Sequence, residues 1–310
     1  MRKKVLVTGC AGFIGSNLVE NLIEKNYEVI GIDDLSTGRM ENLKGMDFRF
    51  VRGSVNDKKL LMEILPDIDY VLHQAAIPSV FRSIDDPVKS NYANVDGTLN
   101  LLVCARDSKV KRVVYASSSS VYGDSIELPK KEDMKINPIS PYALTKYCGE
   151  QYCRLFNDIY GLETICLRYF NVFGPRQDPN SEYSAVIPKF IRLMLNGRRP
   201  VIYGDGLTSR DFTYIENIIE ANILALNAPK NSCGAAYNTA CCERTSLNKM
   251  VETINELLGS NLEPKYDKER VGDVKHSLAD ISKAGKYLNY KPKVLFKEGI
   301  RKTVEWYKNK

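Results

Sequence analysis

The chain has 310 residues, of which 44% are hydrophobic and 26% are charged, and these proportions exclude disordered, fibrous and low-complexity proteins. Its net charge of +6 comes from basic residues interspersed with acidic ones, so we expect a small anionic ligand and no nucleic acid. The eight cysteines form no C-x-x-C pair and there are only two histidines, so we expect free thiols in the cytoplasm and no metal. We also expect no signal peptide and no membrane partner, because no stretch is long and apolar enough to span a bilayer.

Apolar runs and helical patterns alternate along the first half of the chain. The runs typical of strands are residues 4–9, 27–34, 48–53, 69–76, 112–119 and 162–171. The patterns typical of helices are residues 13–26, 57–65, about 87–105 and a stretch from about 140. This order predicts an α/β fold of the Rossmann type, in which a doubly wound parallel sheet binds its ligand at the carboxyl ends of the strands.

The regular alternation fades after residue 175. We expect a helix at about 185–197, irregular structure at 203–213, and a helix at about 211–228 that could return to the first lobe. The chain is therefore predicted to contain a Rossmann domain over residues 1–175, rejoined by about 211–240. A smaller mixed α/β lobe over residues 176–310 is predicted to be interleaved with it.

Three glycines join the first predicted strand to the first predicted helix. Gly9, Gly12 and Gly15 stand where backbone amides and the helix dipole can bind a pyrophosphate. Asp33 ends the next strand, where a carboxylate can accept hydrogen bonds from a ribose diol. This context predicts a dinucleotide site, and the alternative is a tight turn without a ligand. Asp33 favours NAD over NADP because it would repel a 2′-phosphate, although Arg39 leaves NADP open.

Tyr142 and Lys146 are one turn apart on one face if the stretch from Ser140 is a helix. The ammonium group can then favour the ionised phenol. Lowering the pKa of a phenol from ~10 toward 7 takes about 4 kcal/mol, which one ammonium and an oxidised nicotinamide could supply in a shielded site. Four serines, Ser117 to Ser120, end the preceding predicted strand, where a hydroxyl can bond a reacting oxygen or simply cap the turn.

These motifs together resemble the extended short-chain dehydrogenase/reductase superfamily over essentially the whole chain. The matching segments are the glycine loop, Asp33, HQAA at 73–76, SSSSVYG at 117–123, Tyr142-x-x-x-Lys146 and RYFNVFGPR at 168–176. The resemblance implies that Tyr142 is the catalytic base and that Lys146 holds the nicotinamide ribose. It also implies that Ser118 bonds the reacting hydroxyl, with Ser119 and Ser120 as helpers.

The resemblance further implies NAD as the cofactor. The predicted cofactor contacts are Gly9, Gly12, Phe13, Ile14, Gly15, Asp33, Ser36, Gly38, Ser54, Val55, Gln74, Ala75, Ala76, Asn94, Tyr142, Lys146 and Tyr169. One position departs from the family, since Ser54 stands where an adenine-binding acid is usual. This weakens one adenine contact and does not remove the site.

The second lobe resembles the sugar-nucleotide site of UDP-hexose 4-epimerases. The predicted substrate contacts are Ser79, Ser118, Ser119, Ser120, Tyr142, Asn171, Val186, Tyr203, Arg210, Arg270, Asp273 and Ser277. Two arginines of this set can neutralise a diphosphate. The dehydratase branch of the superfamily carries an Asp-Glu pair just before V-Y-G, and the decarboxylase branch a Glu, where this chain has Ser119 and Ser120. The resemblance therefore implies reversible oxidation alone, through a 4-keto sugar.

The resemblance implies that the choice of sugar depends on one position, here called the gate position. Its side chain is small in relatives that accept N-acetyl sugars. Ser277 stands at that position, so we expect UDP-N-acetylglucosamine to be converted to UDP-N-acetylgalactosamine, with UDP-glucose as a further substrate. Uronic acid or galacturonamide forms remain alternatives, since Arg82 and Arg244 could contact a carboxylate. An alternative of another class is a non-catalytic NAD(H)-sensing protein. The resemblance also implies a homodimer, through helices at about 87–105 and 142–158.

Overall fold

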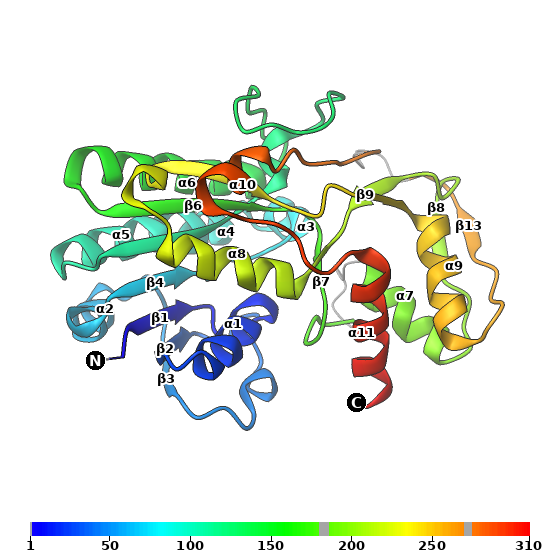
Figure 1. Ribbon diagram of the computed structural model, residues 1–310, viewed down its shortest axis with the longest axis horizontal. Coiled ribbons are helices and arrows are strands. Elements are labelled where there is room, and N and C mark those ends of the chain that lie inside the picture. The colour runs from blue at the N-terminus through cyan, green and yellow to red at the C-terminus, as the bar shows by residue number, and fades with distance from the viewer. Residues whose placement is uncertain (1, 180–185, 270–274) are drawn as a thin grey trace.

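Seven parallel strands form the central sheet of the computed structural model (Figure 1), which describes residues 2–179, 186–269 and 275–310. The order across the sheet is β11-β6-β5-β4-β1-β2-β3. The strands are β1 (Lys4–Thr8), β2 (Glu28–Asp33), β3 (Arg49–Arg52), β4 (Tyr70–His73), β5 (Arg112–Ser118), β6 (Glu163–Tyr169) and β11 (Ala235–Thr239). Val5, Leu6 and Val7 are fully buried, as expected for a strand covered on both faces. The predicted doubly wound parallel sheet is confirmed.

Two layers of helices cover the sheet (Figure 1). One face carries α1 and α8, which contact each other, and the opposite face carries α2, α5 and α6. Their bounds are α1 (Phe13–Glu24), α8 (Ile215–Asn227), α2 (Lys58–Ile64), α5 (Gly97–Asp107) and α6 (Pro141–Tyr160). Each helix buries an apolar stripe against the strands, for example Leu18 and Leu22 of α1.

The helix predicted at about 87–105 is not regular. α4 (Pro87–Asn91) continues into a π-helical turn at Tyr92–Asp96, and only then does α5 begin. Hydrophobic spacing over a long window does not detect the single extra residue of such a turn, so the sequence could not predict it. The turn contains Asn94, whose Oδ1 accepts a hydrogen bond from the amide of Ile77 at 2.8 Å and whose Nδ2 donates to the hydroxyl of Thr145 at 3.1 Å.

A smaller group of elements lies to the right of the sheet in Figure 1. It comprises α7 (Val186–Leu195), α9 (Leu247–Leu258), α11 (Phe296–Lys308), β8 (Val201–Tyr203), β9 (Ser209–Asp211), β12 (Arg244–Ser246) and β13 (Lys265–Asp267). The three helices contact one another, β8 pairs with β13, and β9 pairs with β12. Residues 203–213, predicted to be irregular, thus include β9, because the strands are formed with partners that are distant in the sequence.

The chain returns to the sheet between these elements. α8 packs on β5 and β6, and β11 adds to the edge of the sheet beside β6. The short elements that connect the two groups are α3 (Val80–Asp85), β7 (Val172–Phe173), β10 (Thr213–Tyr214) and α10 (Ser282–Leu288). We infer two interleaved lobes, with a Rossmann domain of residues 1–175 and about 211–240.

Within the residues that the structure describes, no helix combines the length and the apolar character that crossing a membrane requires. All eight cysteines lie in described parts of the chain, and all are free thiols.

Candidate active site

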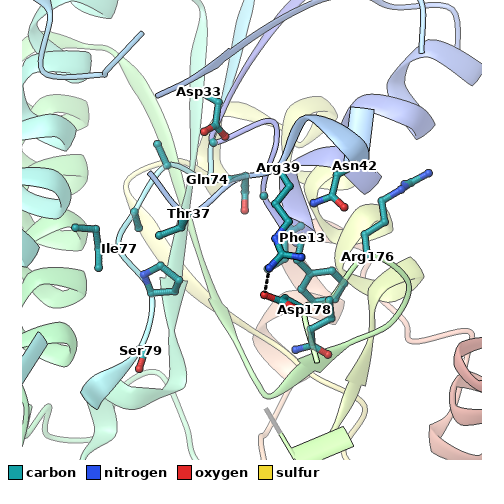
Figure 2. A pocket seen from close by; sticks show the side chains of 18 of the residues that line it. Phe13, Asp33, Thr37, Arg39, Asn42, Gln74, Ile77, Ser79, Arg176 and Asp178 are labelled. Atoms are coloured by element: carbon teal, nitrogen blue, oxygen red, sulfur yellow. Dashed lines mark hydrogen bonds and ion pairs between the residues drawn. The ribbon is translucent and has the colours of Figure 1, made fainter. Parts of the chain in front are cut away.

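A cavity of about 1430 Å³ opens at the carboxyl ends of β1, β2, β4 and β5, the position expected for the ligand of a doubly wound sheet. The predicted cofactor contacts that line it are Gly9, Gly12, Phe13, Ile14, Gly15, Asp33, Ser36, Ser54, Val55, Gln74, Ala75, Ala76, Tyr142, Lys146 and Tyr169. Three predicted substrate contacts also line it, namely Ser79, Tyr142 and Asn171. Figure 2 shows Asp33, Gln74 and Phe13 around this space.

The glycine loop has no room for side chains. Gly9 has a φ of +67°, and a Cβ atom there would lie 2.8 Å from the backbone nitrogen of Ala75. A Cβ atom on Gly15 would lie 2.0 Å from the carbonyl oxygen of Gly9. The loop leads directly into α1, whose first turn has no acidic residue and whose N-terminus has no side-chain cap. Free amides and the helix dipole thus face the cavity, which fits the pyrophosphate of a dinucleotide.

Asp33 is fixed at the end of β2 by two backbone amides. Its Oδ2 accepts from Ala11 at 2.9 Å and its Oδ1 accepts from Leu35 at 2.8 Å. Burial raises the pKa of this carboxyl group, and the two hydrogen bonds act in the opposite direction. Gly38 does not line the cavity but supports this carboxylate, since a Cβ atom there would lie 2.8 Å from Oδ1. The carboxylate has a set orientation beside the cavity, as a ribose contact requires.

Asn94 also lies outside the cavity lining. Its hydrogen bonds join Ile77, in the lining loop after β4, to Thr145 on α6. It therefore connects the cofactor side of the cavity with the helix that carries Tyr142 and Lys146.

α6 begins where the sequence predicted. Ser140 caps it by accepting a hydrogen bond from the amide of Ala143 at 3.2 Å, and Pro141 occupies its first turn. Lys146 is buried one turn after Tyr142, with its Nζ 5.9 Å from the centre of the Tyr142 ring. The same Nζ donates to the carbonyl oxygen of Ala116 at 2.8 Å. The predicted pairing of the two side chains on one face is present.

Burial governs the ionisation of both groups. It lowers the pKa of the Lys146 ammonium to about 8 and raises the pKa of the Tyr142 phenol. A hydrogen bond between the side chains of Ser118 and Tyr142 lowers the phenol's pKa in part. The residues of the chain alone therefore leave the pKa of the phenol above its ordinary value. The sequence argument had expected a lowered pKa, caused in part by Lys146.

The serine segment, residues 117–120, runs from the end of β5 into a short turn. Ser118 ends β5, and its hydroxyl accepts a hydrogen bond from the amide of Ser120 at 3.1 Å. Ser119 and Ser120 form a 3₁₀ turn that leads to Tyr122. The hydroxyl of Ser120 is buried and has no hydrogen-bond partner among the described residues. Ser118 to Ser120 do not line the cavity, whereas Ser117 does.

The predicted substrate residues of the second lobe are only partly brought together. Asn171 donates through Nδ2 to the hydroxyl of Ser277 at 3.2 Å, and that hydroxyl also accepts from the amide of Asp211 at 3.2 Å. Arg210 follows Ser209 on β9, and its guanidinium donates to the carbonyl oxygen of Lys275 at 2.9 Å. Val186 begins α7 and Tyr203 ends β8, and neither lines the cavity. Arg270 and Asp273 lie outside the described residues.

A strap of residues 174–178 lies over the cofactor side of the cavity. Arg176 pairs with Glu20 of α1 at 2.6 Å, and Arg39 pairs with Asp178 at 2.5 Å. Figure 2 shows the second pair beside Phe13. The sequence analysis treated Arg39 only as a possible phosphate contact, because an ion pair to a residue so distant in the chain leaves no local signal.

The sequence analysis used His73 only as part of the HQAA segment and gave it no role of its own, and the structure shows it buried. Its Nδ1 lies 2.7 Å from the hydroxyl of Thr8 and its Nε2 lies 3.0 Å from that of Thr98, which donates to the carbonyl oxygen of Asn94. Nε2 therefore carries the proton and Nδ1 accepts from Thr8. Burial, with a smaller effect of Lys146, lowers the pKa of His73 to about 3. Neutral His73, at the end of β4, thus connects Thr8 of β1 with the π-helical turn through Thr98.

The model of the NAD dependent epimerase/dehydratase family matches residues 5–240. The chain belongs to this family. It is 44% identical over 307 residues to a putative UDP-glucose 4-epimerase of Methanocaldococcus jannaschii, with 98% of each chain covered.

Two solved structures of the family superpose closely on the chain. A UDP-N-acetylglucosamine 4-epimerase of Methanobrevibacter ruminantium, in complex with UDP-N-acetylmuramic acid, has a TM-score of 0.95 at 44% identity, and each chain is 99% covered. A variant of a UDP-glucuronic acid 4-epimerase of Bacillus cereus, in complex with NAD and UDP-4-deoxy-4-fluoro-glucuronic acid, has a TM-score of 0.91 at 33% identity, with 99% of each chain covered.

The predicted family, the fold, the NAD cofactor and the assignment to enzymes of the UDP-sugar 4-epimerase type are confirmed. The relatives differ in the sugar that their names carry. The roles of individual residues and the identity of the sugar therefore belong to the proposal that follows.

Proposed function

We propose that this chain inverts C4 of a UDP-linked hexose, and that UDP-N-acetylglucosamine, converted to UDP-N-acetylgalactosamine, is its main substrate. The observation that carries the proposal is the placement of Tyr142 in the lining of the dinucleotide cavity, one turn from Lys146 and beside Ser118, whose hydroxyl lowers the pKa of the phenol. A phenol, a cation and a hydroxyl in this arrangement can exchange a proton with a sugar alcohol.

In the proposed reaction, Tyr142 accepts the proton of the sugar 4-hydroxyl, and Ser118 bonds the same oxygen. NAD, held by the residues that line the cavity, would supply a reversible exchange of hydride with C4, and return of the hydride to the opposite face of the 4-keto sugar would invert that carbon. Tyr142 then gives its proton back to the new hydroxyl. No external oxidant is consumed, so the chain should retain its cofactor between turnovers.

Lys146 has two proposed tasks. Its ammonium remains mostly charged at neutral pH, since its pKa is about 8, and its charge favours the ionised form of Tyr142. The ammonium also lies in the cavity lining, where it can bond the ribose of a dinucleotide. The carbonyl oxygen of Ala116 accepts one of its protons and fixes its position.

The absence of a second acid supports epimerisation over elimination of water. Ser119 and Ser120 stand before V-Y-G, where related dehydratases would need an acid and a base. Ser120 is proposed as a contact of a sugar hydroxyl because its own buried hydroxyl has no partner among the described residues, although it does not line the cavity.

Ser277 supports an N-acetyl sugar. Its hydroxyl is held by Asn171 and by the amide of Asp211, so a small side chain is fixed beside a residue that lines the cavity. We propose that this leaves room for an acetamido group, with Arg210 neutralising the diphosphate. Arg270 and Asp273, proposed for the same diphosphate and for its ribose, lie outside the described residues.

A uronic acid substrate is the second candidate. It is favoured by Arg82, which lines the cavity and could contact a carboxylate, whereas Arg244 is exposed on β12. A non-catalytic NAD(H) sensor is disfavoured, because Tyr142, Lys146 and Ser118 are all retained.

We further propose a cytoplasmic homodimer. Exposed apolar side chains gather on α4 and the end of α6, among them Val88 at 77% and Ile159 at 64% exposure. Packing these faces against a second copy would bury them. A reducing compartment would keep the eight thiols free.

The decisive experiment supplies the purified protein with UDP-N-acetylglucosamine and no added cofactor, and follows the sugar protons by NMR. Appearance of UDP-N-acetylgalactosamine is expected. Ser277→Tyr should abolish this reaction but keep turnover of UDP-glucose, whereas Ser277→Ala, which loses the same hydroxyl bonds but stays small, should keep both. Turnover of UDP-glucuronate alone would establish the second candidate, and no turnover of any of the three would reject the epimerase.

A further inference from the structure

A buried ion pair lies directly behind the serine segment. Glu150 of α6 and Arg168 of β6 are each 4% exposed. Arg168 donates through Nε to Oε1 of Glu150 at 2.8 Å and through Nη2 to Oε2 at 2.8 Å, so the pair is bidentate. Such a pair is costly to bury, and apolar residues of similar size would serve stability equally well. Its presence here calls for a functional reason.

The pair holds residues on both sides of Ser118. Oε1 of Glu150 accepts a hydrogen bond from the hydroxyl of Ser117 at 2.5 Å. The guanidinium of Arg168 donates to the hydroxyl of Tyr122 at 2.9 Å. Ser118 and the turn that follows it are therefore fixed before and after by one connected group of hydrogen bonds.

The same group continues into the second half of the chain. Tyr122 donates its own proton to Oδ1 of Asn238 at 2.7 Å, and Asn238 donates to the carbonyl oxygens of Lys130 and Asp280. The buried chain of bonds thus joins α6 and β6 to β11 and to the segment that precedes α10. Ser118 thus lies between two residues, Ser117 and Tyr122, that are anchored in this group.

The pair also fixes the helix that carries the base. Tyr142, Lys146 and Glu150 follow one another at four-residue spacing, so all three project from one face of α6 toward β5. Arg168 lies opposite Ser117 in the register of β5 and β6. Glu150 therefore ties the face that bears Tyr142 to the strand that bears Ser118.

We propose that Glu150 and Arg168 are positioning residues that hold Ser118 within hydrogen-bond reach of Tyr142. This inference rests on the proposed function, because it assigns the pair a task in the same reaction. Neither side chain touches the substrate. The hydroxyl of Ser118 favours the ionised phenol, so loss of the alignment makes Tyr142 a weaker base and shifts the activity to higher pH.

Other ionisable groups near Glu150 and Arg168 do not account for the expected shift in the pKa of Tyr142. Burial raises the pKa of Tyr115, and a hydrogen bond with Cys153 together with burial raises that of Cys166, so both stay neutral at neutral pH. Burial also raises the pKa of Glu132, whose Oε1 accepts from the amide of Asn238. Lys146 faces Tyr142 directly and is unchanged in the variants that follow.

The chain contains a matched control. Arg112 and Glu163 form a second ion pair, which joins β5 to β6 at the ends of these strands opposite to Ser117 and Arg168. Nε and Nη2 of Arg112 both donate to Oε2 of Glu163, at 3.0 and 2.6 Å. Glu163→Gln should destabilise the protein much as Glu150→Gln does, without reaching the site. The pH dependence of kcat is measured for both variants and for the wild type, together with KM and the NAD content.

Glu150→Gln should lower kcat at pH 7 by about tenfold and move the acidic limb of the profile upward by about one pH unit, with KM nearly unchanged. Glu163→Gln should give the wild-type profile. Equal profiles for the two variants would overturn the inference, and an inactive wild type would overturn the proposed function and the inference with it. If Glu150→Gln does not fold, Ser117→Ala, which removes one hydrogen bond and leaves the ion pair intact, should shift the limb in the same direction by about half a unit. A wild-type profile for Ser117→Ala would then reject the inference.

Discussion

Replacing Lys146 with methionine tests the central element of the proposed mechanism. The Nζ of Lys146 lies 5.9 Å from the centre of the Tyr142 ring. At an effective dielectric constant of about 20, a unit charge at this distance stabilises a phenolate by about 3 kcal/mol, or about 2 pKa units. Lys146→Met should therefore raise the kinetic pKa of the base by about 2 units and lower kcat at pH 7 by about 100-fold.

The variant should fold normally, so a change in its pH profile can be attributed to the lost charge. Burial lowers the pKa of Lys146 from 10.5 to about 8, so the folded protein binds this proton less tightly than the unfolded chain does. At pH 7 this costs about 3 kcal/mol of stability, and methionine, which carries no charge, removes the cost. The carbonyl oxygen of Ala116 loses its partner, which costs about 1–3 kcal/mol. The two effects oppose each other, so the melting temperature should change little.

The assay is the pH profile of kcat for epimerisation, with the bound NAD of each preparation measured after denaturation. Lys283→Met is the matched control, because Lys283 also donates to a carbonyl oxygen, that of Ala236 at 3.0 Å, and lies 5.0 Å from the centre of a tyrosine ring, that of Tyr237. This lysine does not line the cavity. A Lys146→Met enzyme that contains NAD and keeps the wild-type profile would refute the electrostatic reasoning.

Three further results are expected. Asp178→Asn breaks the ion pair with Arg39 and should speed the release of bound NAD by up to about fivefold at low salt, as measured by exchange with labelled NAD. A release rate equal to that of the wild type would show that the strap does not contribute to cofactor retention. The folded pKa of His73, about 3, lies below its ordinary value of 6.5, so its stabilising contribution is complete above pH 6.5 and falls by about 1.4 kcal/mol for each pH unit below it. The difference in unfolding free energy between the wild type and His73→Gln, from urea titrations, should shrink accordingly from pH 7 to 5.5, and a constant difference would contradict the buried, neutral histidine. Val88→Asp combined with Ile159→Asp should convert a dimer into a monomer in light scattering, while a monomeric wild type would disprove the dimer.

Local patterns were sufficient for the parts of the molecule that depend on neighbours in the sequence. The alternation of apolar runs and amphipathic helices predicted the parallel sheet, because each element must bury one face. Gly9 and Gly15 could be recognised from spacing alone, since the loop allows no side chain there. The four-residue interval between Tyr142 and Lys146 likewise placed both on one helix face.

Contacts between distant segments could not be predicted in this way. Asn171 and Ser277 meet across 106 positions of sequence, and Arg39 meets Asp178 across 139. Glu150 could have been suspected, since it continues the four-residue spacing of Tyr142 and Lys146, but its partner depends on the register of β5 and β6. Charge patterns alone do not fix such a register.

The segment ACCERTS at residues 240–246, which follows β11, is held through its backbone. Asp211 is fully buried, and its carboxylate accepts hydrogen bonds from the amides of Cys241, Cys242 and Ala279 at 3.0 to 3.1 Å. Burial raises the pKa of Asp211 to about 6, so the carboxylate is mostly ionised at neutral pH and can use both oxygens as acceptors. The amides of the loop are therefore held by one carboxylate, and its thiols add hydrogen bonds, from Cys241 to the carbonyl oxygen of Val294 and from Cys242 to that of Ala279. Because the backbone amide of Asp211 also donates to the hydroxyl of Ser277, this single residue ties the loop after β11 to the proposed gate of the sugar pocket.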